Sequence, residues 1–350
     1  MMLQGIQKQI SRTRSGPGKK VFAAAFCAAL LCVNLLSGTA SAAVLVALDL
    51  ADIVEQTAPS VVEVFTETKQ VSRFFREYVT EGAGSGVILT SDGYIVTNHH
   101  VVDGATAIKV RLSDGTACDA ALQGTDAKTD LAVLKIDASN LTPAKLADSS
   151  KARPGDFVIA IGNPLGELGG TVTEGIVSAM DREITIDGET MTLMQTSAAV
   201  NPGNSGGGLF NLDGELIGVV NSKSSGSGIE GLAFAIPSNT VSEITDELMQ
   251  HGYVTGRPQL RIRVAQVTAP GVSGGIHFDR PGVYILQADD GSGLKTGDRL
   301  LRIDGTTIAE TGDISAVLER RRVGDTVKVD ISREGREVGI NVTLTEKKPA

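Results

Sequence analysis

Short apolar runs separated by turn residues recur along most of the chain, and they restrict the fold more than any other feature of the sequence. Runs such as 61–65, 85–89 and 107–112 are five or six residues long, and the Asp92-Gly93 pair is a hairpin signal. The chain contains 41 glycines, no tryptophan and only 4% aromatic residues, which suits strands and turns better than long helices. The pattern therefore predicts a mostly β fold.

A second series of strand-like runs follows at 156–162, 175–179 and 215–220. The length of 350 residues is enough for two domains with separate cores. Loops at which two strand-built units meet can hold functional side chains on a rigid scaffold. Side chains that perform chemistry are therefore expected in loops.

A helix is predicted over residues 238–250, after the second series of strands. Ser238 or Asn239 is expected to cap it, and Val241, Ile244 and Leu248 lie on one face.

A serine flanked by glycines lies in the segment 201–208, NPGNSGGG. Each glycine held in an ordered loop costs backbone entropy, so this composition needs a reason. Acyl-transfer chemistry supplies one, with Ser205 as the nucleophile and the N–H groups of Gly203 and Ser205 as the oxyanion hole. A glycine-rich surface loop explains the same residues equally well.

Two upstream segments contain the partners that a serine nucleophile needs. The segment 97–102, TNHHVV, follows a strand-like run, and Asp130 opens another apolar run. A neutral hydroxyl needs an imidazole to accept its proton and a buried carboxylate to orient that imidazole. The order His, Asp, Ser is that of chymotrypsin-like proteases, and not that of subtilisins or α/β-hydrolases.

Four segments together resemble the HtrA/DegP family of serine proteases, and they occur in the order of that family. They are TNHHVV (97–102), TDLAVLK (129–135), AAVNPGNSGG (198–207) and FAIPSN (234–239). The resemblance extends from about Ala51 to the C-terminus.

In that family the fourth position of the histidine motif is the base, which assigns His100 rather than His99. The resemblance also assigns Asp130 as the carboxylate and Ser205 as the nucleophile. It implies a chymotrypsin-like double β-barrel protease domain over residues 51–252.

The resemblance also implies substrate-binding and regulatory residues. Val200 would line the pocket for the side chain that precedes the cleaved bond. Glu230 stands at a pocket position that is usually apolar. If Glu230 faces the pocket, the protease would favour a basic or polar residue before the cleaved bond. If it faces solvent, the family preference for small aliphatic residues such as Val or Ala would hold. Arg182 resembles the loop arginine that links activator binding to the oxyanion loop, although a surface arginine explains it as well.

The last part of the chain, residues 257–347, resembles a small α+β PDZ domain through the segment GLKTGDRLLRIDG (293–305). A helix with Ile314, Val317 and Leu318 on one face is expected to follow that segment. PDZ domains bind an extended peptide C-terminus beside a strand and hold its carboxylate with backbone amides.

The resemblance places this carboxylate-binding loop at Leu260, Arg261 and Ile262. Arg261 stands where the family usually has glycine. It would either clamp the carboxylate or block the loop shape that glycine allows.

Other partners are indicated more weakly. The net charge of −9 argues against non-specific nucleic-acid binding. Phe74, Phe75 and Tyr78 are candidates for a homotrimer contact, because aromatic residues near the start of the protease domain pack into a trimer in the family. Cys118 is the one cysteine beyond the leader, and the histidines show no ligand spacing, so neither an intramolecular disulfide nor a metal or other cofactor is expected.

Residues 1–43 are typical of an export leader. A basic segment without acidic residues precedes an apolar run and then small residues that end in Ala-Ser-Ala, as in a signal peptide cleaved after Ala42. Because apolar residues continue through 43–48, an uncleaved anchor helix is the alternative. Both place the remaining chain outside the cytoplasm, in the periplasm or at the cell surface.

These features predict an exported serine endopeptidase that cleaves misfolded or unfolded polypeptides and binds peptide C-termini through its PDZ domain. A membrane-anchored stress-signalling protease with few substrates is one alternative. A chaperone-like binding protein with little proteolysis is the other.

Overall fold

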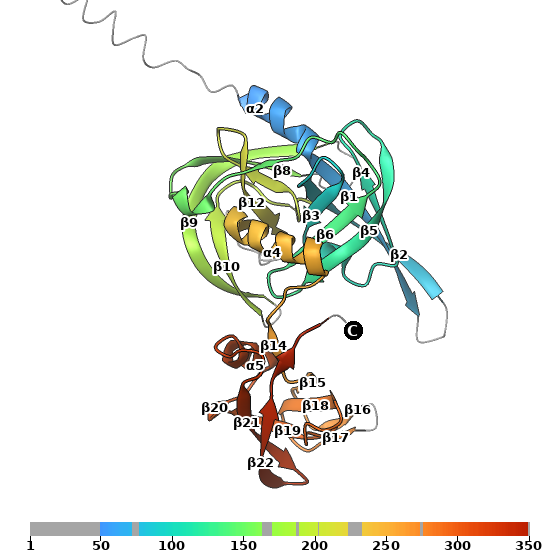
Figure 1. Ribbon diagram of the computed structural model, residues 1–350, viewed down its shortest axis with the longest axis vertical. Coiled ribbons are helices and arrows are strands. Elements are labelled where there is room, and N and C mark those ends of the chain that lie inside the picture. Colours follow the sequence, from blue (N-terminus) through green and yellow to red (C-terminus); the bar gives the residue numbers. More distant parts are fainter. Residues whose placement is uncertain are drawn as a thin grey trace, which may run out of the picture. The chain divides into compact units, whose positions relative to one another are not determined.

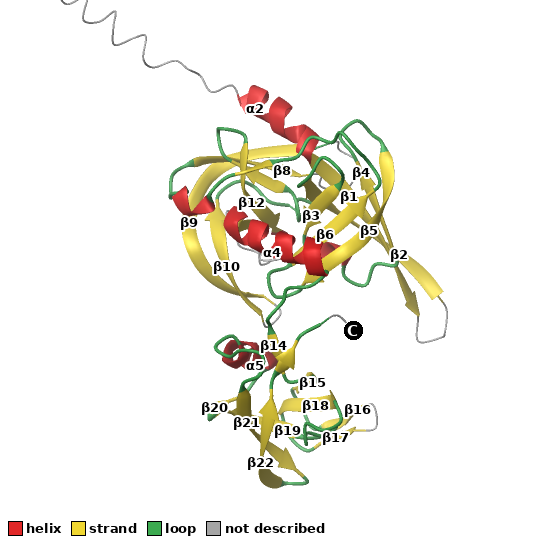
Figure 2. Cartoon of the chain, viewed as in Figure 1, coloured by secondary structure: helices red, strands yellow, loops and turns green. Residues whose placement is uncertain are grey.

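The computed structural model describes residues 50–71, 77–162, 170–186, 189–201, 203–222, 233–273 and 276–348. Strands make up most of the regular structure in these ranges, which confirms the predicted mostly β fold (Figures 1 and 2). The expected leader and the aromatic residues Phe74 and Phe75 lie outside the described residues, and only the backbone of Tyr78 is described. In the described ranges, no helix combines the length and the apolar character that crossing a bilayer requires.

The first barrel is closed by strands paired in the order β1-β2-β3-β6-β5-β4. These strands are β1 (Val61–Val71), β2 (Glu77–Ile88), β3 (Tyr94–Thr97), β4 (Ala107–Arg111), β5 (Ala117–Asp126) and β6 (Leu131–Ile136). Val64, Ile95, Val110 and Leu134 are completely buried in its interior. Each such side chain stabilises the fold by about 1.5–3 kcal/mol relative to an exposed position.

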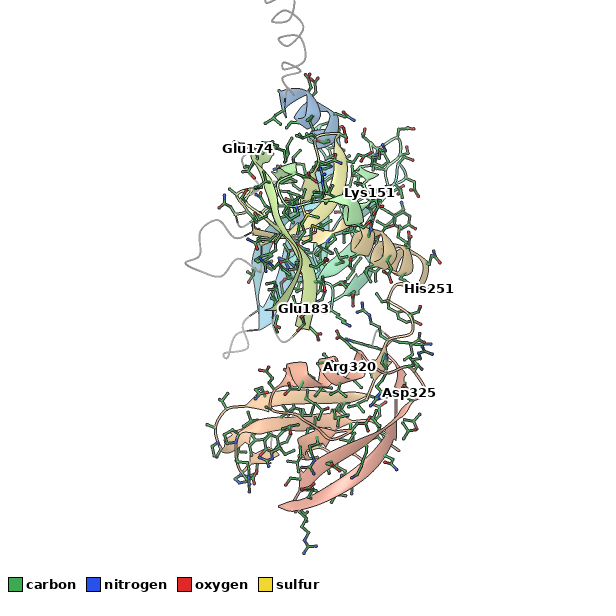
Figure 3. All side chains as sticks on the ribbon, turned by 90° about the vertical axis from the view of Figure 1, so that its left-hand side faces the viewer. Lys151, Glu174, Glu183, His251, Arg320 and Asp325 are labelled. Carbon is green, nitrogen blue, oxygen red and sulfur yellow. The ribbon has the colours of Figure 1, made fainter. Side chains whose placement is uncertain are left out.

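The second barrel is a sheet with the order β11-β8-β9-β10-β13-β12-β7, which an additional pairing of β11 with β12 closes on itself. Its strands are β7 (Lys145–Leu146), β8 (Phe157–Gly162), β9 (Thr171–Ile186), β10 (Glu189–Thr196), β11 (Gly208–Phe210), β12 (Glu215–Asn221) and β13 (Ala233–Pro237). Glu174 and Glu183 of β9 are exposed (Figure 3). The strand therefore extends beyond the apolar run 175–179 and includes charged residues at exposed positions.

The remaining helical segments near the barrels are α2 (Leu50–Thr57), η1 (Ala58–Ser60), α3 (His99–Val102), η2 (Ser149–Lys151) and α4 (Ser238–His251). Helix α4 buries Val241, Ile244 and Leu248 and ends at Gly252, whose φ is 79°. The N-cap residue is Pro237, and not the expected Ser238 or Asn239. The side chain of Asn239 instead accepts a hydrogen bond from the N–H of Ser149, at 3.2 Å.

The C-terminal domain contains a sheet with the order β15-β18-β19-β21-β22, and β20 pairs with β19. Its elements are β14 (Pro258–Gln259), β15 (Ile262–Val267), β16 (Gly271–Ser273), β17 (Ile276–Phe278), β18 (Gly282–Ala288), β19 (Arg299–Ile303), β20 (Thr306–Thr307), α5 (Thr311–Leu318), β21 (Thr326–Arg333), β22 (Arg336–Thr343) and β23 (Thr345–Glu346). Ile314, Val317 and Leu318 of α5 pack against the core of this domain, as the spacing predicts. Glu334 and Gly335 form the turn between β21 and β22, and both have positive φ.

Candidate active site

Asp130 lies in a turn directly before β6, and its backbone has the left-handed φ of 55°. Among residues other than glycine, Asp and Asn adopt this conformation most readily. The carbonyl oxygen of Asp130 accepts hydrogen bonds from the side-chain amide of Asn98 (3.0 Å) and from the N–H of His99 (3.1 Å). These bonds hold the start of helix α3 against Asp130, whose side chain is only 5% exposed.

His100 lies between Asp130 and Ser205. Its Nδ1 is 2.7 Å from Oδ2 of Asp130, and its Nε2 is 2.9 Å from Oγ of Ser205. The backbone N–H of His100 also donates to Oδ1 of Asp130, at 3.0 Å. Because the carboxylate accepts from Nδ1, the neutral imidazole carries its proton there and leaves Nε2 to accept the proton of the serine hydroxyl.

Ser205 lies in a turn whose shape depends on two glycines. Gly203 and Gly206 have φ values of 101° and 84°. A Cβ on Gly206 would lie 2.2 Å from the carbonyl oxygen of Ser85, so a larger residue does not fit. Within the described residues, no hydrogen bond uses the N–H group of Gly203 or of Ser205. Two available donors beside a hydroxyl are what an oxyanion hole requires.

Asn221 and Ser222 were not predicted from the sequence. The side-chain amide of Asn221 is completely buried and donates to Oδ2 of Asp130, at 3.0 Å. The hydroxyl of Ser222 contacts the hydroxyl of Ser205. An Asn-Ser pair at the end of a strand carries no signal of its own, because only the closure of the second barrel brings β12 to the first barrel.

His99 points to a different partner from its neighbour. Its Nδ1 is 2.7 Å from Oγ1 of Thr125, and its Nε2 is 3.9 Å from a carboxylate oxygen of Asp103. His99 thus flanks the cluster formed by His100, Asp130 and Ser205 without a hydrogen bond to the Ser205 hydroxyl.

The other residues expected near the substrate are not all placed. Val200 is half-buried and packs beside the core of the second barrel. Arg182 is exposed on β9, where it pairs across the sheet with Leu193 of β10. Glu230 lies outside the described residues, so its direction stays a prediction.

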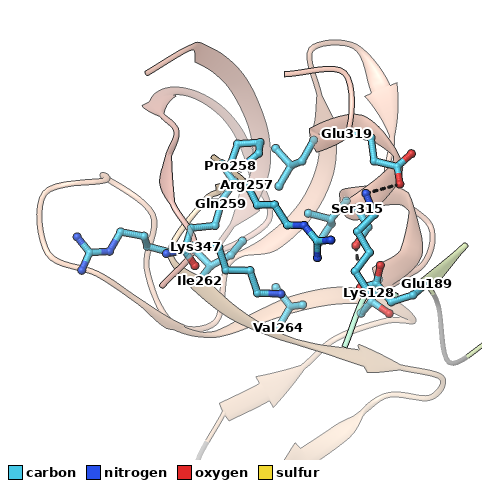
Figure 4. A pocket seen from close by; sticks show the side chains of 15 residues that line it. Lys128, Glu189, Arg257, Pro258, Gln259, Ile262, Val264, Ser315, Glu319 and Lys347 are labelled. Atoms are coloured by element: carbon cyan, nitrogen blue, oxygen red, sulfur yellow. Dashed lines mark hydrogen bonds and ion pairs between the residues drawn. The ribbon is translucent and has the colours of Figure 1, made fainter. Parts of the chain in front are cut away.

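A groove of about 330 Å³ lies beside β15 and helix α5 of the C-terminal domain (Figure 4). Apolar side chains form much of its lining: Leu260, Ile262, Val264, Ile314 and Leu318. Charged side chains lie around it, and in Figure 4 Lys128 is joined to Glu319, at 2.8 Å.

Arg261 adopts the left-handed backbone that glycine usually supplies, with a φ of 53°. Its guanidinium is 2.7 Å from the carboxylate of Asp289 and is more exposed than buried. The arginine therefore does not prevent the left-handed loop shape, and its charge is already paired.

The sequence matches the trypsin-like peptidase domain family at residues 84–219 and the PDZ domain family at residues 258–344. It is 42% identical over 287 residues to "Serine protease Do-like HtrA" of Lactobacillus helveticus, and the aligned region covers 76% of this chain and 69% of that protein. It is 40% identical over 329 residues to the protein of the same name from Bacillus subtilis (strain 168), covering 85% of this chain and 73% of that one. The solved structure of the HtrA-type protease AlgW with tripeptide is 35% identical, with a TM-score of 0.57 over 86% of this chain and 98% of that chain. The chain is therefore a serine endopeptidase of the HtrA/DegP family, with a trypsin-like protease domain followed by a PDZ domain.

Proposed function

We propose that Ser205, His100 and Asp130 form the catalytic triad of this protease. The observation that carries the proposal is the pair of contacts made by the imidazole, 2.7 Å to Asp130 and 2.9 Å to Ser205. His100 accepts the hydroxyl proton as Oγ of Ser205 attacks the peptide carbonyl, and it then donates that proton to the leaving amine. Asp130 stabilises the imidazolium that forms between these steps, supported by the amide of Asn221.

The N–H groups of Gly203 and Ser205 form the oxyanion hole in this mechanism. They donate to the carbonyl oxygen of the substrate as it gains negative charge, and this stabilises the transition state more than the bound substrate. Water then hydrolyses the acyl-enzyme, with His100 again acting as the base.

The substrates in this proposal are unfolded or misfolded polypeptides outside the cytoplasm. Support comes from the leader-like residues 1–43 and from relatives such as one of Marinomonas sp. (strain MWYL1), 35% identical over 337 residues, named a probable periplasmic serine endoprotease. We expect the purified protein to cleave unfolded casein at least tenfold faster than a stably folded protein of similar length, because an endoprotease needs an extended segment at its active site. Mass spectrometry of the products should show cuts after Val or Ala, the small aliphatic residues expected beside Val200.

Two results would contradict this substrate assignment. Cleavage of one native protein with none of casein would favour a signalling protease. Cuts mainly after Lys or Arg would mean that Glu230 faces the pocket.

The groove beside α5 is proposed to bind the C-terminus of a peptide, with its carboxylate at the amides of Leu260, Arg261 and Ile262. Replacing Ile314 with lysine would place a charge among apolar walls, and we expect the Kd for a labelled peptide that ends in valine to rise at least tenfold. Fluorescence anisotropy measures this Kd. The matched control is Val323→Lys, a change of the same kind at a side chain that is 42% exposed and does not line the groove.

A copy of the peptide with an amidated C-terminus separates carboxylate recognition from non-specific binding. It should bind at least tenfold more weakly than the free acid to the unmodified protein. Equal binding of the two peptides would exclude a carboxylate site in this groove.

Arg182 is proposed to take part in regulation from β9, and the chain is proposed to assemble as a homotrimer, exported through its leader or anchored by it. Light scattering of the exported part measures the mass of the assembly. The mass of the N-terminal peptide after export shows whether the chain is cut after Ala42.

A further inference from the structure

Ser85 lies on β2 of the first barrel and makes two hydrogen bonds to the turn of the second barrel that contains Ser205. It is completely buried, and its hydroxyl donates to the carbonyl oxygen of Gly203 at 2.7 Å. Its backbone N–H donates to the carbonyl oxygen of Ser205 at 2.8 Å. The two peptide groups that flank the N–H of Ser205 are therefore both held by one residue.

These bonds hold the backbone of the two residues that carry the donors of the oxyanion hole. In a planar peptide group the carbonyl of one residue is fixed together with the N–H of the next, so the two Ser85 bonds fix the peptide groups that lie between Gly203 and Asn204 and between Ser205 and Gly206. Gly203 has no Cβ and its backbone can take many conformations, which leaves its orientation to outside contacts. The carbonyl of Asn204, between the two held groups, accepts from the N–H of Gly207 at 2.9 Å. The hydroxyl of Ser85 holds the carbonyl end of Gly203, the residue whose own N–H is the other donor.

Ser85 also links this turn to the strand that leads to His100. Its carbonyl oxygen accepts a hydrogen bond from the hydroxyl of Thr97, which is completely buried, at 2.7 Å. There is little free space around this link, because a Cβ on Gly206 would lie 2.2 Å from the same carbonyl oxygen and 2.5 Å from the Thr97 hydroxyl. Ser85 thus joins the strand before the base to the turn of the nucleophile.

We infer that Ser85 is a positioning residue for the oxyanion hole, acting through the carbonyl of Gly203. The inference rests on the proposed role of Ser205 as the nucleophile. Ser85 does not touch the substrate; its hydroxyl keeps the Gly203 and Ser205 N–H groups converged on one oxygen position across the interface of the barrels.

The variant Ser85→Ala tests this inference, because it removes the hydroxyl and leaves both backbone hydrogen bonds in place. We expect kcat for a peptide substrate to fall about tenfold, less than the roughly 10²–10³-fold loss that follows removal of an oxyanion donor itself. KM should stay within about twofold, since the ground-state carbonyl depends little on these donors. The inhibition constant of a peptide boronate, whose tetrahedral adduct places an oxygen in the hole, should rise by about the same tenfold factor.

The matched control is Ser238→Ala. Ser238 is also buried, and its hydroxyl also donates to a backbone carbonyl at 2.7 Å, that of Ala147. It therefore loses an equivalent hydrogen bond away from the triad, and we expect its kcat and boronate affinity to match those of the unmodified protein. Ser85→Cys keeps a weak donor and should give intermediate values.

Two outcomes would overturn the inference. One is unchanged boronate affinity in Ser85→Ala. The other is an equal loss of substrate and boronate binding together with a lower Tm than that of Ser238→Ala, which would indicate a structural role only. If Ser85→Ala does not fold, the kcat and boronate affinity of Ser85→Cys decide the matter in the same way. Full activity in Ser205→Ala would instead remove the proposed mechanism itself, so the two failures are distinguishable.

Discussion

Replacing Ser205 with alanine is expected to lower kcat for peptide hydrolysis by about five to six orders of magnitude. The variant removes the only atom that can attack the substrate carbonyl in the proposed mechanism, and the oxyanion donors alone provide little acceleration. Release of peptides from labelled casein measures the effect. A fluorophosphonate probe that labels the unmodified protein should not label the variant, because the hydroxyl that it modifies is absent.

Ser60→Ala is the control for this comparison. Ser60 is buried, and its hydroxyl donates to the carbonyl of Thr57 at 2.7 Å, so alanine removes a structural hydrogen bond there without touching the triad. Its activity should match that of the unmodified protein. Casein cleavage by Ser205→Ala at a normal rate would rule out the mechanism.

Replacing Asp130 with asparagine is expected to lower kcat by about four orders of magnitude. The carboxylate accepts three hydrogen bonds, from Nδ1 and the backbone N–H of His100 and from the amide of Asn221. An asparagine places an NH₂ group against at least one of these donors and removes the charge that stabilises the imidazolium. Discontinuous assays of peptide hydrolysis with long incubation times measure the residual rate.

Two comparisons show whether chemistry or folding causes this loss. Asparagine tolerates the left-handed backbone of position 130, so the Tm of Asp130→Asn should fall only slightly. Asn221→Ala leaves the contact between His100 and Asp130 in place and should lower kcat by about tenfold, in line with the loss of one hydrogen bond to a charged group. A smaller effect of Asp130→Asn than of Asn221→Ala would contradict the assigned order of roles.

The residues of the proposed triad could be found from the sequence, whereas those that contact and support them could not. His100, Asp130 and Ser205 each occur in a short segment with a distinctive composition, and the structure brings their side chains together. Asn221 and Ser85 act through contacts across the barrels, 91 and 118 residues apart in the sequence. Such contacts depend on how the two barrels pack, which local patterns do not specify.

The helices and strands also differ in which of their features local patterns predict and which depend on tertiary contacts. The apolar stripe of α4 was predicted correctly, because burial of Val241, Ile244 and Leu248 determines it. The cap was wrong, because the Asn239 side chain is used by Ser149, a tertiary contact. The expected strand 175–179 extends to Thr171–Ile186, since pairing with β8 and β10 continues beyond the apolar residues.

The residues of the proposed triad belong to different barrels, with His100 and Asp130 in the first and Ser205 in the second. During synthesis the first barrel emerges without a nucleophile, and it has no means of cutting its own unfolded continuation. The same holds for a damaged molecule in which either barrel has opened. An enzyme of this design can cleave polypeptides only once it is itself fully folded.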